Sequence, residues 1–320
     1  MQTADGESGT AKAPQSLFGV VRYRANTAAR MGGKIQERYR MTQIMDVARR
    51  AFSPFGRVKV VDIGANPIGG DAPYQALIDN DMCSLYGFEP QLEAYEKLLD
   101  LDHPNATYVN AAVGDGESHK LHIYRQDGLS SFFPLRQANI DTLNFSGHEL
   151  VRTVEIPTVR LDDIKEIDRI DFLKIDTQGA ELMILNNGDT KMKAALAVQI
   201  EMRFLQLYDG EPGLGKLLDW LSVRDFEFHN LLVLTRFMLR GTRRPGFNRR
   251  MKHQVGDGDG LFVRNLTAFD KLTPEEIGRL GALACGLGQS NLRFYCLLNL
   301  IKAGQVDPAL EADMVAAILA

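Results

Sequence analysis

The sequence predicts an α/β fold in which a mostly parallel, doubly wound sheet is covered by helices on both faces. Short β-branched runs alternate with helical stretches from residue 58 to residue 264, which is the pattern of repeated βαβ units. The runs are apolar along their length, as in strands that are buried on both sides. Several of them end directly before an acidic residue, which would place acids along one edge of the sheet.

Each expected element follows from this alternation. The expected strands of the sheet are residues 58–63, 84–88, 107–113, 171–175, 197–202, 226–234 and 261–264. The expected helices between them are residues 72–80, 91–101, 180–187 and 214–223. After residue 119 the alternation of strands and helices is interrupted by a hairpin strand at 120–125, a Ser-rich loop and a strand at 154–159. We therefore expect an insertion over the sheet.

Both ends of the chain are predicted to lie outside this domain, which we place at residues 52–266. Residues 1–16 are rich in Gly, Ser, Thr and Ala and predict a disordered leader. Residues 17–51 carry apolar positions about 3.6 residues apart among many basic ones, which predicts a helical extension. Residues 267–320 predict a helical appendage, because Thr273-Pro274-Glu275-Glu276 combines an N-cap, a proline at the first helical position and a capping glutamate.

The composition limits the class of protein. Of the 320 residues, 45% are hydrophobic and 24% are charged, which is typical of a globular chain. The formal net charge of -4 disfavours a nucleic-acid partner. Three cysteines without CxxC spacing give neither a disulfide framework nor a zinc site, so we expect a cytoplasmic protein. No apolar run approaches the roughly 18 residues of a transmembrane helix.

A glycine-rich turn follows the first expected strand. The run Val60-Val61-Asp62-Ile63-Gly64-Ala65-Asn66-Pro67-Ile68-Gly69-Gly70 takes a buried strand straight into this turn, where a ligand can approach the backbone. The turn lacks the GxGxxG spacing of a dinucleotide site, and Pro67 removes one N–H donor that a pyrophosphate would use. A nicotinamide cofactor is therefore disfavoured. The alternative to any ligand site is a purely steric role, because glycine-rich first turns are common in α/β proteins.

The next two signals are acids at later strand ends. In Tyr86-Gly87-Phe88-Glu89-Pro90, a carboxylate stands where dinucleotide folds bind ribose hydroxyls, although it also suits the start of the following helix. Asp176 and Glu201 follow two further strands, and neighbouring strand ends would bring them into one crevice. Desolvation there would raise a carboxylate pKa toward the range of a general base. The alternative for each acid is a structural role in holding a loop.

Two alternatives to a carboxylate base remain open. A divalent metal held by Asp176 and Glu201 would lower the pKa of a hydroxyl, but a firm third ligand is missing, so a metal is not favoured. His229 follows the start of a later strand and is a second candidate base, although a lone histidine in an apolar run is more often structural.

Taken in order, the motifs resemble those of the FkbM family of S-adenosylmethionine-dependent methyltransferases over residues 58–264. The similar runs are Val61-Asp62-Ile63-Gly64-Ala65-Asn66, Phe88-Glu89-Pro90, Ala112-Val113-Gly114-Asp115 and Phe172-Leu173-Lys174-Ile175-Asp176-Thr177-Gln178-Gly179-Ala180-Glu181. The resemblance implies the class I, Rossmann-like methyltransferase fold with a seven-stranded sheet. It also implies methylation of a hydroxyl on a sugar, glycan or related secondary metabolite.

The resemblance further implies a set of site residues. The cofactor-binding residues are Asp62, Gly64, Ala65, Asn66, Phe88, Glu89, Asn110, Ala111, Ala112 and Asp176. The turn from Asp62 would face the methionine part of the cofactor, Glu89 its ribose hydroxyls, and the segment from Asn110 its adenine. Near the acceptor hydroxyl the resemblance implies Asp176, Glu201, Gln178 and Glu181. Two features depart from the commonest pattern: the turn reads GANPIGG instead of a shorter GANxG, and Thr177-Gln178 replaces the frequent Val-Glu.

A basic segment at residues 236–252 contains no acidic residue and includes Arg243 and Arg244. Arginine forks match phosphate and carboxylate oxygens, so the segment suits an anionic acceptor, with a solvated loop or a homo-oligomer contact as the alternative. The leading function is an S-adenosylmethionine-dependent O-methyltransferase that uses Asp176 or Glu201 as base or orienter for in-line transfer. The alternatives are a nicotinamide-dependent oxidoreductase and a non-catalytic, methyltransferase-like assembly module in glycan biosynthesis.

Overall fold

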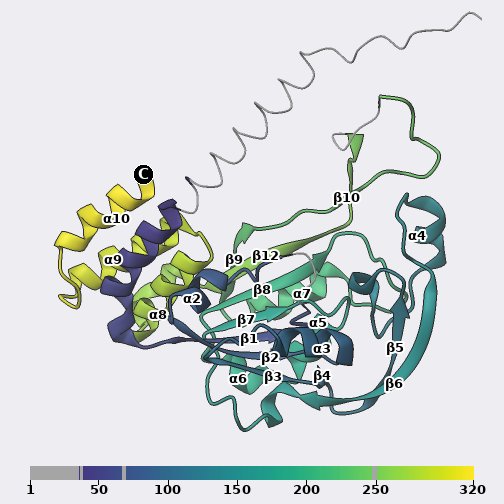
Figure 1. Cartoon of the computed structure of the whole chain (residues 1–320), viewed down its shortest axis with the longest axis horizontal. Coiled ribbons are helices and arrows are strands. Elements are labelled where there is room, and N and C mark those ends of the chain that lie inside the picture. The colour runs from purple at the N-terminus through teal and green to yellow at the C-terminus, as the bar shows by residue number, and fades with distance from the viewer. Residues whose placement is uncertain (1–35, 37–38, 67–69, 247–250) are drawn as a thin grey trace, which may run out of the picture.

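The computed structural model describes residue 36 and residues 39–66, 70–246 and 251–320. Its centre is a seven-stranded sheet with the strand order β3-β2-β1-β7-β8-β12-β9 (Figure 1). The strands are β1 (Val58–Ile63), β2 (Cys83–Phe88), β3 (Ala106–Val109), β7 (Phe172–Ile175), β8 (Ala197–Arg203), β9 (Phe226–Leu231) and β12 (Asp257–Arg264). All neighbours are parallel except β12, which runs antiparallel to β8 and β9. The predicted class I methyltransferase architecture is confirmed.

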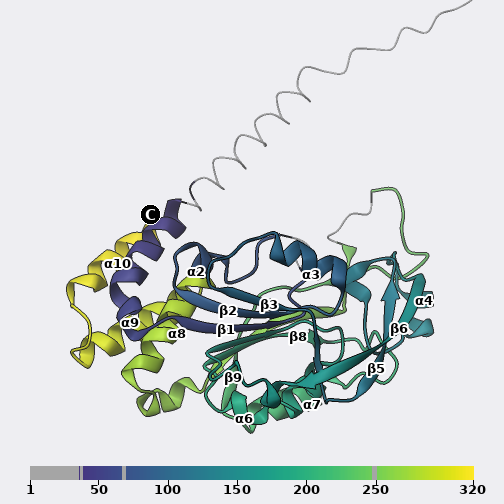
Figure 2. The same ribbon diagram turned by 60° about the horizontal axis from the view of Figure 1, so that its bottom comes forward.

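Successive residues of the central strands point into two different cores. Val58 and Val60 of β1 belong to one core, whereas Val61 and Ile63 belong to the other. The helices that follow the strands are α2 (Gln75–Asp79), α3 (Leu92–Leu99), α5 (Glu181–Asn186), α6 (Asp189–Met192) and α7 (Leu214–Ser222). Figure 2 shows α2 and α3 above the sheet and α6 and α7 below it. Burial on both faces explains why these strands are apolar at nearly every position.

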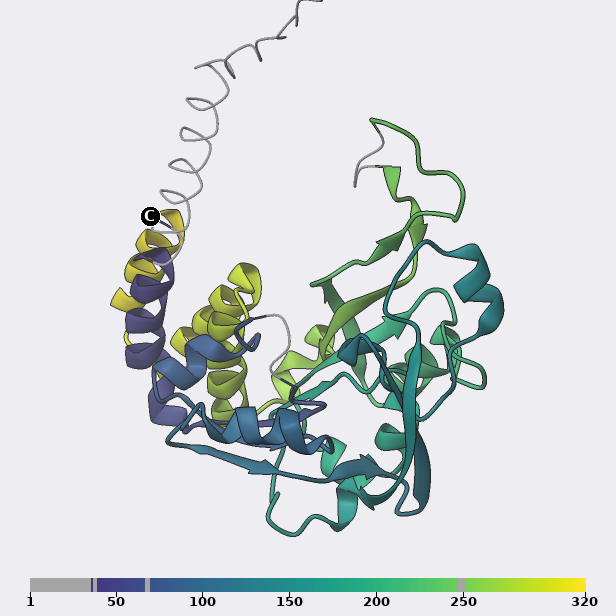
Figure 3. The ribbon, with the colours of Figure 1, turned by 45° about the vertical axis from the view of Figure 1, so that its right-hand side comes forward.

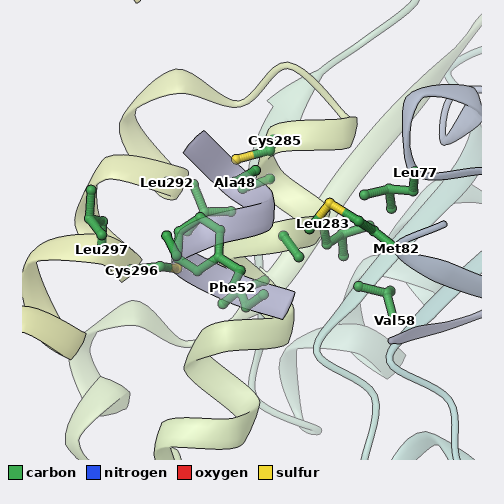
Figure 4. Close-up of a cluster of buried hydrophobic side chains, with 14 of the residues drawn as sticks. Ala48, Phe52, Val58, Leu77, Met82, Leu283, Cys285, Leu292, Cys296 and Leu297 are labelled. Atoms are coloured by element: carbon green, nitrogen blue, oxygen red, sulfur yellow. The ribbon is translucent and has the colours of Figure 1, made fainter. Parts of the chain in front are cut away.

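The first long helix that the structure describes meets the last three helices on one side of the sheet. A helix over residues 39–52 packs with α8 (Pro274–Gly286), α9 (Ser290–Lys302) and α10 (Ala309–Leu319) in the first of these cores (Figure 3). Figure 4 shows Phe52 from this helix beside Leu292 and Cys296 of α9. The predicted capping box is confirmed, because the Thr273 hydroxyl accepts from Glu276 N and the Glu276 carboxylate accepts from Thr273 N.

A glycine of α8 is needed where this helix meets the helix over residues 39–52. A Cβ at Gly281 would lie 2.5 Å from the ring of Phe52, which is fully buried. We expect Gly281→Ala to lower the free energy of unfolding by about 1–3 kcal/mol, because overpacking outweighs the better helix propensity of alanine. Urea denaturation measures the change. The control is Gly215→Ala in α7, where a Cβ meets nothing within 4 Å. Equal stability of the two variants would contradict the prediction.

The insertion over the sheet forms a second, three-stranded sheet in the order β4-β6-β5. Its strands are β4 (Ala112–Gly114), β5 (Ser118–Tyr124) and β6 (Leu150–Arg160), with α4 (Gln137–Thr142) between the last two, and a separate ribbon joins β10 (Arg236–Phe237) to β11 (Gln254–Val255). The predicted single strand at 107–113 is therefore wrong. The chain leaves the main sheet at Asn110, whose side-chain amide donates to the carbonyl oxygens of Glu89 and Pro90, and β4 pairs with β6 instead.

The predictions for the N-terminal residues fall mostly on residues that the structure does not describe. The predicted leader at 1–16 lies outside the described residues, as does most of the predicted helical extension at 17–51. The last part of that extension is the helix over residues 39–52. Within the described ranges, no helix combines the length and the apolar character that crossing a membrane requires.

Candidate functional site

A cavity of about 720 Å³, which we call the large cavity, opens where the parallel strands of the main sheet end. Because β12 runs the opposite way, its first residues lie at this same edge. Most residues that the sequence proposed for cofactor binding line the large cavity, namely Asp62, Gly64, Ala65, Asn66, Phe88, Glu89, Ala111, Ala112 and Asp176, together with Gln178. The loops after β1, β2, β3 and β7 are thus brought together, as expected for ligand sites in open α/β sheets.

The turn after β1 is held by its own backbone. Gly64 has φ +81°, and a Cβ there would lie 2.0 Å from the carbonyl oxygen of Asp176, so only glycine lets the turn pack against the end of β7. The N–H groups of Gly64 and Ala65 both donate to the carbonyl oxygen of Phe88, at 3.0 and 3.1 Å. These donors are therefore already used, and they do not form the N–H cradle that a pyrophosphate requires.

A largely buried ion pair lies at the floor of the large cavity. Lys174 lies opposite Asp62 in the β1–β7 register, and its Nζ is 2.9 Å from Asp62 Oδ1. The hydroxyl of Tyr74 donates to the other oxygen of Asp62 at 2.6 Å. Burial lowers the pKa of Lys174, but the negative charges of Asp62 and Asp176 outweigh it and raise the pKa above its ordinary value. Lys174 was not proposed from the sequence, although a lone lysine within the apolar run Phe172-Leu173-Lys174-Ile175 was an available signal.

Gln178 separates the two acids that the sequence proposed as bases. Its side-chain amide donates to Asp176 Oδ1 at 2.7 Å and to Glu201 Oε2 at 3.0 Å. Its oxygen accepts from Arg203 and lies 3.1 Å from the Tyr208 hydroxyl. Gln178 has φ +58°, a left-handed conformation that is uncommon for a residue other than glycine. This backbone geometry places the amide between Asp176, which lines the large cavity, and Glu201, which does not.

Glu201 and Glu181 instead line a separate cavity of about 20 Å³, which we call the small cavity. Arg203 binds Glu201 there at 2.7 Å and Asp257 at 3.1 Å. Burial raises the pKa of Glu201 well above its ordinary range, against the opposing charge of Arg203. Glu181 accepts hydrogen bonds from the backbone N–H groups of Thr177 and Gly179, so it holds the loop after β7.

The acid after β2 is buried at the wall of the large cavity. Glu89 is 3% exposed, and its Oε1 accepts from the backbone N–H of Gln91 at 2.8 Å, just before α3 begins. Glu89 therefore binds the backbone at the start of α3 and also lines the large cavity. Asn110 does not line the large cavity, because its amide ties the end of β3 to the end of β2.

Gln199 and Asp259 also line the large cavity and were not proposed from the sequence. Gln199 of β8 lies opposite Lys174 in the register, and its amide donates to Asp259 of β12 at 3.0 Å. Burial and the charge of Asp176 raise the pKa of Asp259, while Gln199 and Lys174 oppose the shift. Asp259 was not proposed because the last strand was expected to start at residue 261, whereas β12 begins at Asp257.

The remaining proposed residues lie away from the large cavity. His229 is half-buried on β9, where burial lowers its pKa. Arg243 and Arg244 are exposed, and Arg244 donates to backbone carbonyls of its own loop. Residues 247–250 of the basic segment lie outside the described residues. In the part of the chain that the structure describes, no group of three or more His, Cys, Asp or Glu side chains is arranged to hold a metal ion.

Several solved structures are similar to the chain at low sequence identity. The precorrin-6y C5,15-methyltransferase from Geobacter metallireducens GS-15 shares 12% identity with a TM-score of 0.32, and the match covers 70% of this chain and 88% of that one. The putative tRNA (m1A22) methyltransferase Sp1610 from Streptococcus pneumoniae shares 13% with a TM-score of 0.34, over 85% and 93%. The plantazolicin methyltransferase BpumL in complex with SAH shares 11% with a TM-score of 0.30, over 74% and 90%.

No curated protein matches the chain. The family model described as "Methyltransferase FkbM domain" matches residues 62–228. This segment begins at the first acid of the large cavity and includes the ends of β1, β2, β3, β7 and β8. Because the match extends over more than half of the 320 residues, the chain belongs to the FkbM methyltransferase family.

Proposed function

We propose that the protein is an S-adenosylmethionine-dependent O-methyltransferase that acts on a hydroxyl of a sugar, glycan or related metabolite. The observation that supports this function best is the convergence of Asp62, Glu89 and Asp176 on one cavity from three strand ends. Acidic side chains suit a cofactor that carries a cationic sulfur and a ribose. The backbone N–H groups of Gly64 and Ala65, by contrast, already donate to the carbonyl oxygen of Phe88, which disfavours binding of the pyrophosphate of a nicotinamide cofactor.

We assign the methionine part of the cofactor to the turn at Asp62–Asn66, its ribose to Glu89 and its adenine to the segment of Ala111 and Ala112. The cofactor supplies an electrophilic methyl group on sulfur. The chain must hold the acceptor oxygen in line with the carbon–sulfur bond and accept the hydroxyl proton. We assign these tasks to Asp176 because it lines the large cavity, whereas Glu201 is held by Arg203 behind the amide of Gln178.

A cytoplasmic location is part of the proposal. All three cysteines, Cys83, Cys285 and Cys296, are buried and free. Reduced cysteines are typical of a reducing compartment. The acceptor is proposed to be a small molecule or glycan, and Arg243 and Arg244 are available on the surface for an anionic one.

The assignment of Glu89 is tested by cofactor binding. We expect Glu89→Ala to weaken S-adenosylmethionine binding by about 10-fold or more, because hydrogen bonds to a charged group contribute roughly 1.5–3 kcal/mol each. Isothermal titration calorimetry measures the dissociation constant, and thermal unfolding checks that the variant is folded. The matched control is Glu93→Ala, which removes an exposed glutamate from the first turn of α3.

Two outcomes of this titration would count against the proposal in different ways. If folded wild-type protein gives no binding signal with S-adenosylmethionine, the proposed cofactor is wrong. If wild type binds the cofactor and Glu89→Ala binds it equally well, only the role of Glu89 is wrong. Turnover is then sought by incubating the wild type with methyl-labelled cofactor and a panel of mono- and oligosaccharides.

A further inference from the structure

Asp259 lies in the large cavity but outside the segment that matches the family model. That segment ends at residue 228, whereas Asp259 belongs to β12, the antiparallel strand that brings its first residues to the edge of the sheet. The side chain lines the large cavity together with Asp176, Lys174 and Gln199. The position of Asp259 in the large cavity is therefore set by residues that lie beyond the matched segment.

The charges at the floor of the large cavity do not balance. Lys174, whose side chain is 14% exposed, is bound directly to the buried Asp62. Asp176 and Asp259 line the same cavity, and the Asp176 charge disfavours ionisation of Asp259. Arg203 lies behind Gln178 and lines the small cavity instead. The floor thus carries more carboxylates than cations, and a ligand with a positive charge would relieve the repulsion between them.

Gln199 adds a second observation that points to a ligand. The residue is 4% exposed, its Nε2 donates to Asp259 Oδ2, and its Oε1 is buried with no hydrogen-bond partner among the described residues. A buried amide oxygen without a partner is costly, and such atoms are usually satisfied by a bound group. Gln199 and Asp259 both line the large cavity, so this amide and the carboxylate that it binds lie together in the cavity wall.

We propose that Asp259, held by Gln199, is a specificity-determining residue of the methyl-transfer site that favours the cationic donor S-adenosylmethionine over its uncharged-sulfur product, S-adenosylhomocysteine. The proposal rests on the proposed function. The two ligands carry the same adenosine, ammonium and carboxylate groups and differ only in the methyl group and the positive charge on sulfur. A carboxylate near that sulfur therefore strengthens binding of the donor much more than binding of the product, which promotes product release.

The test compares two dissociation constants by calorimetry, with S-adenosylmethionine and S-adenosylhomocysteine as the probes. In Asp259→Asn, which keeps the shape of the side chain and an acceptor for Gln199, we expect the preference for the donor to fall by about threefold or more. Affinity for the product should stay within about twofold. Asp163→Asn makes the same change of charge at an exposed residue outside the large cavity, and its preference should equal that of wild type.

A second variant keeps the test decisive if Asp259→Asn does not fold. Gln199→Met removes both the hydrogen bond to Asp259 and the unpaired oxygen, and it should lower the preference in the same direction. An unchanged preference in a folded variant, or an equal loss of affinity for both ligands, overturns the role of Asp259. If wild type binds neither ligand, the proposed function fails instead, so the two failures are distinguishable.

Discussion

Asp176→Asn is expected to slow methyl transfer by about 100-fold while S-adenosylmethionine still binds. A positioned proton acceptor typically contributes a factor of about 10²–10⁴, and an amide of the same shape cannot accept the proton from the acceptor hydroxyl. Because Gln178 donates to Asp176 Oδ1 in the native protein, an asparagine oxygen can keep that hydrogen bond. The loss should therefore appear in kcat rather than in the affinity for the cofactor.

The measurement uses the saccharide that wild type methylates fastest, under single-turnover conditions with methyl-labelled cofactor. Glu201→Gln is the informative comparison, because Glu201 is the other acid that the sequence proposed. Its carboxylate is bound to Arg203 at 2.7 Å and lines only the small cavity, so we expect a loss of stability with a much smaller change in rate. If Glu201→Gln slows transfer as much as Asp176→Asn in a folded protein, the assignment of the base to Asp176 is wrong.

The order and type of the main elements were predictable, because the apolar composition of each strand can be read from its own short stretch of sequence. Each central strand except β3 and the first part of β12 was found within a few residues, since strands buried on both faces are apolar throughout. The division of residues 107–113 into β3 and β4 was not predictable. It depends on the hydrogen bonds from the Asn110 amide to Glu89 and Pro90, directly after β2, and on pairing with β6, which begins 36 residues after β4 ends.

The candidate site was predictable to a similar extent. Acids at strand ends located the edge where Asp62, Glu89 and Asp176 line one cavity, because parallel strands end together. The separation of Asp176 from Glu201 was not predictable, since it arises from the left-handed backbone at Gln178 and from Arg203 on the following strand. Asp259 was missed for another reason, because an acid between two glycines does not resemble a strand residue by propensity.

Arg279→Ala is expected to lower the free energy of unfolding by about 3 kcal/mol, because it removes one of the two arginines that bind a fully buried carboxylate. Arg279 in α8 donates to Asp171 Oδ1 at 2.9 Å, and Asp171, directly before β7, has no exposed surface. Arg169 and the backbone N–H of Lys59 still bind Asp171 in the variant, so the loss should lie near the lower end of the range for broken buried pairs. Urea denaturation measures the change.

The matched control is Arg50→Ala, which removes an arginine that joins the helix over residues 39–52 to the C-terminal helices. Arg50 binds Asp313 of α10 at 2.7 Å, but both side chains are about half exposed, so water compensates for most of the loss and less than about 1 kcal/mol is expected. Equal losses in the two variants would mean that the Asp171–Arg279 pair contributes no more than a surface ion pair. A larger loss in Arg279→Ala would show that the C-terminal helices are anchored to the sheet through this buried carboxylate.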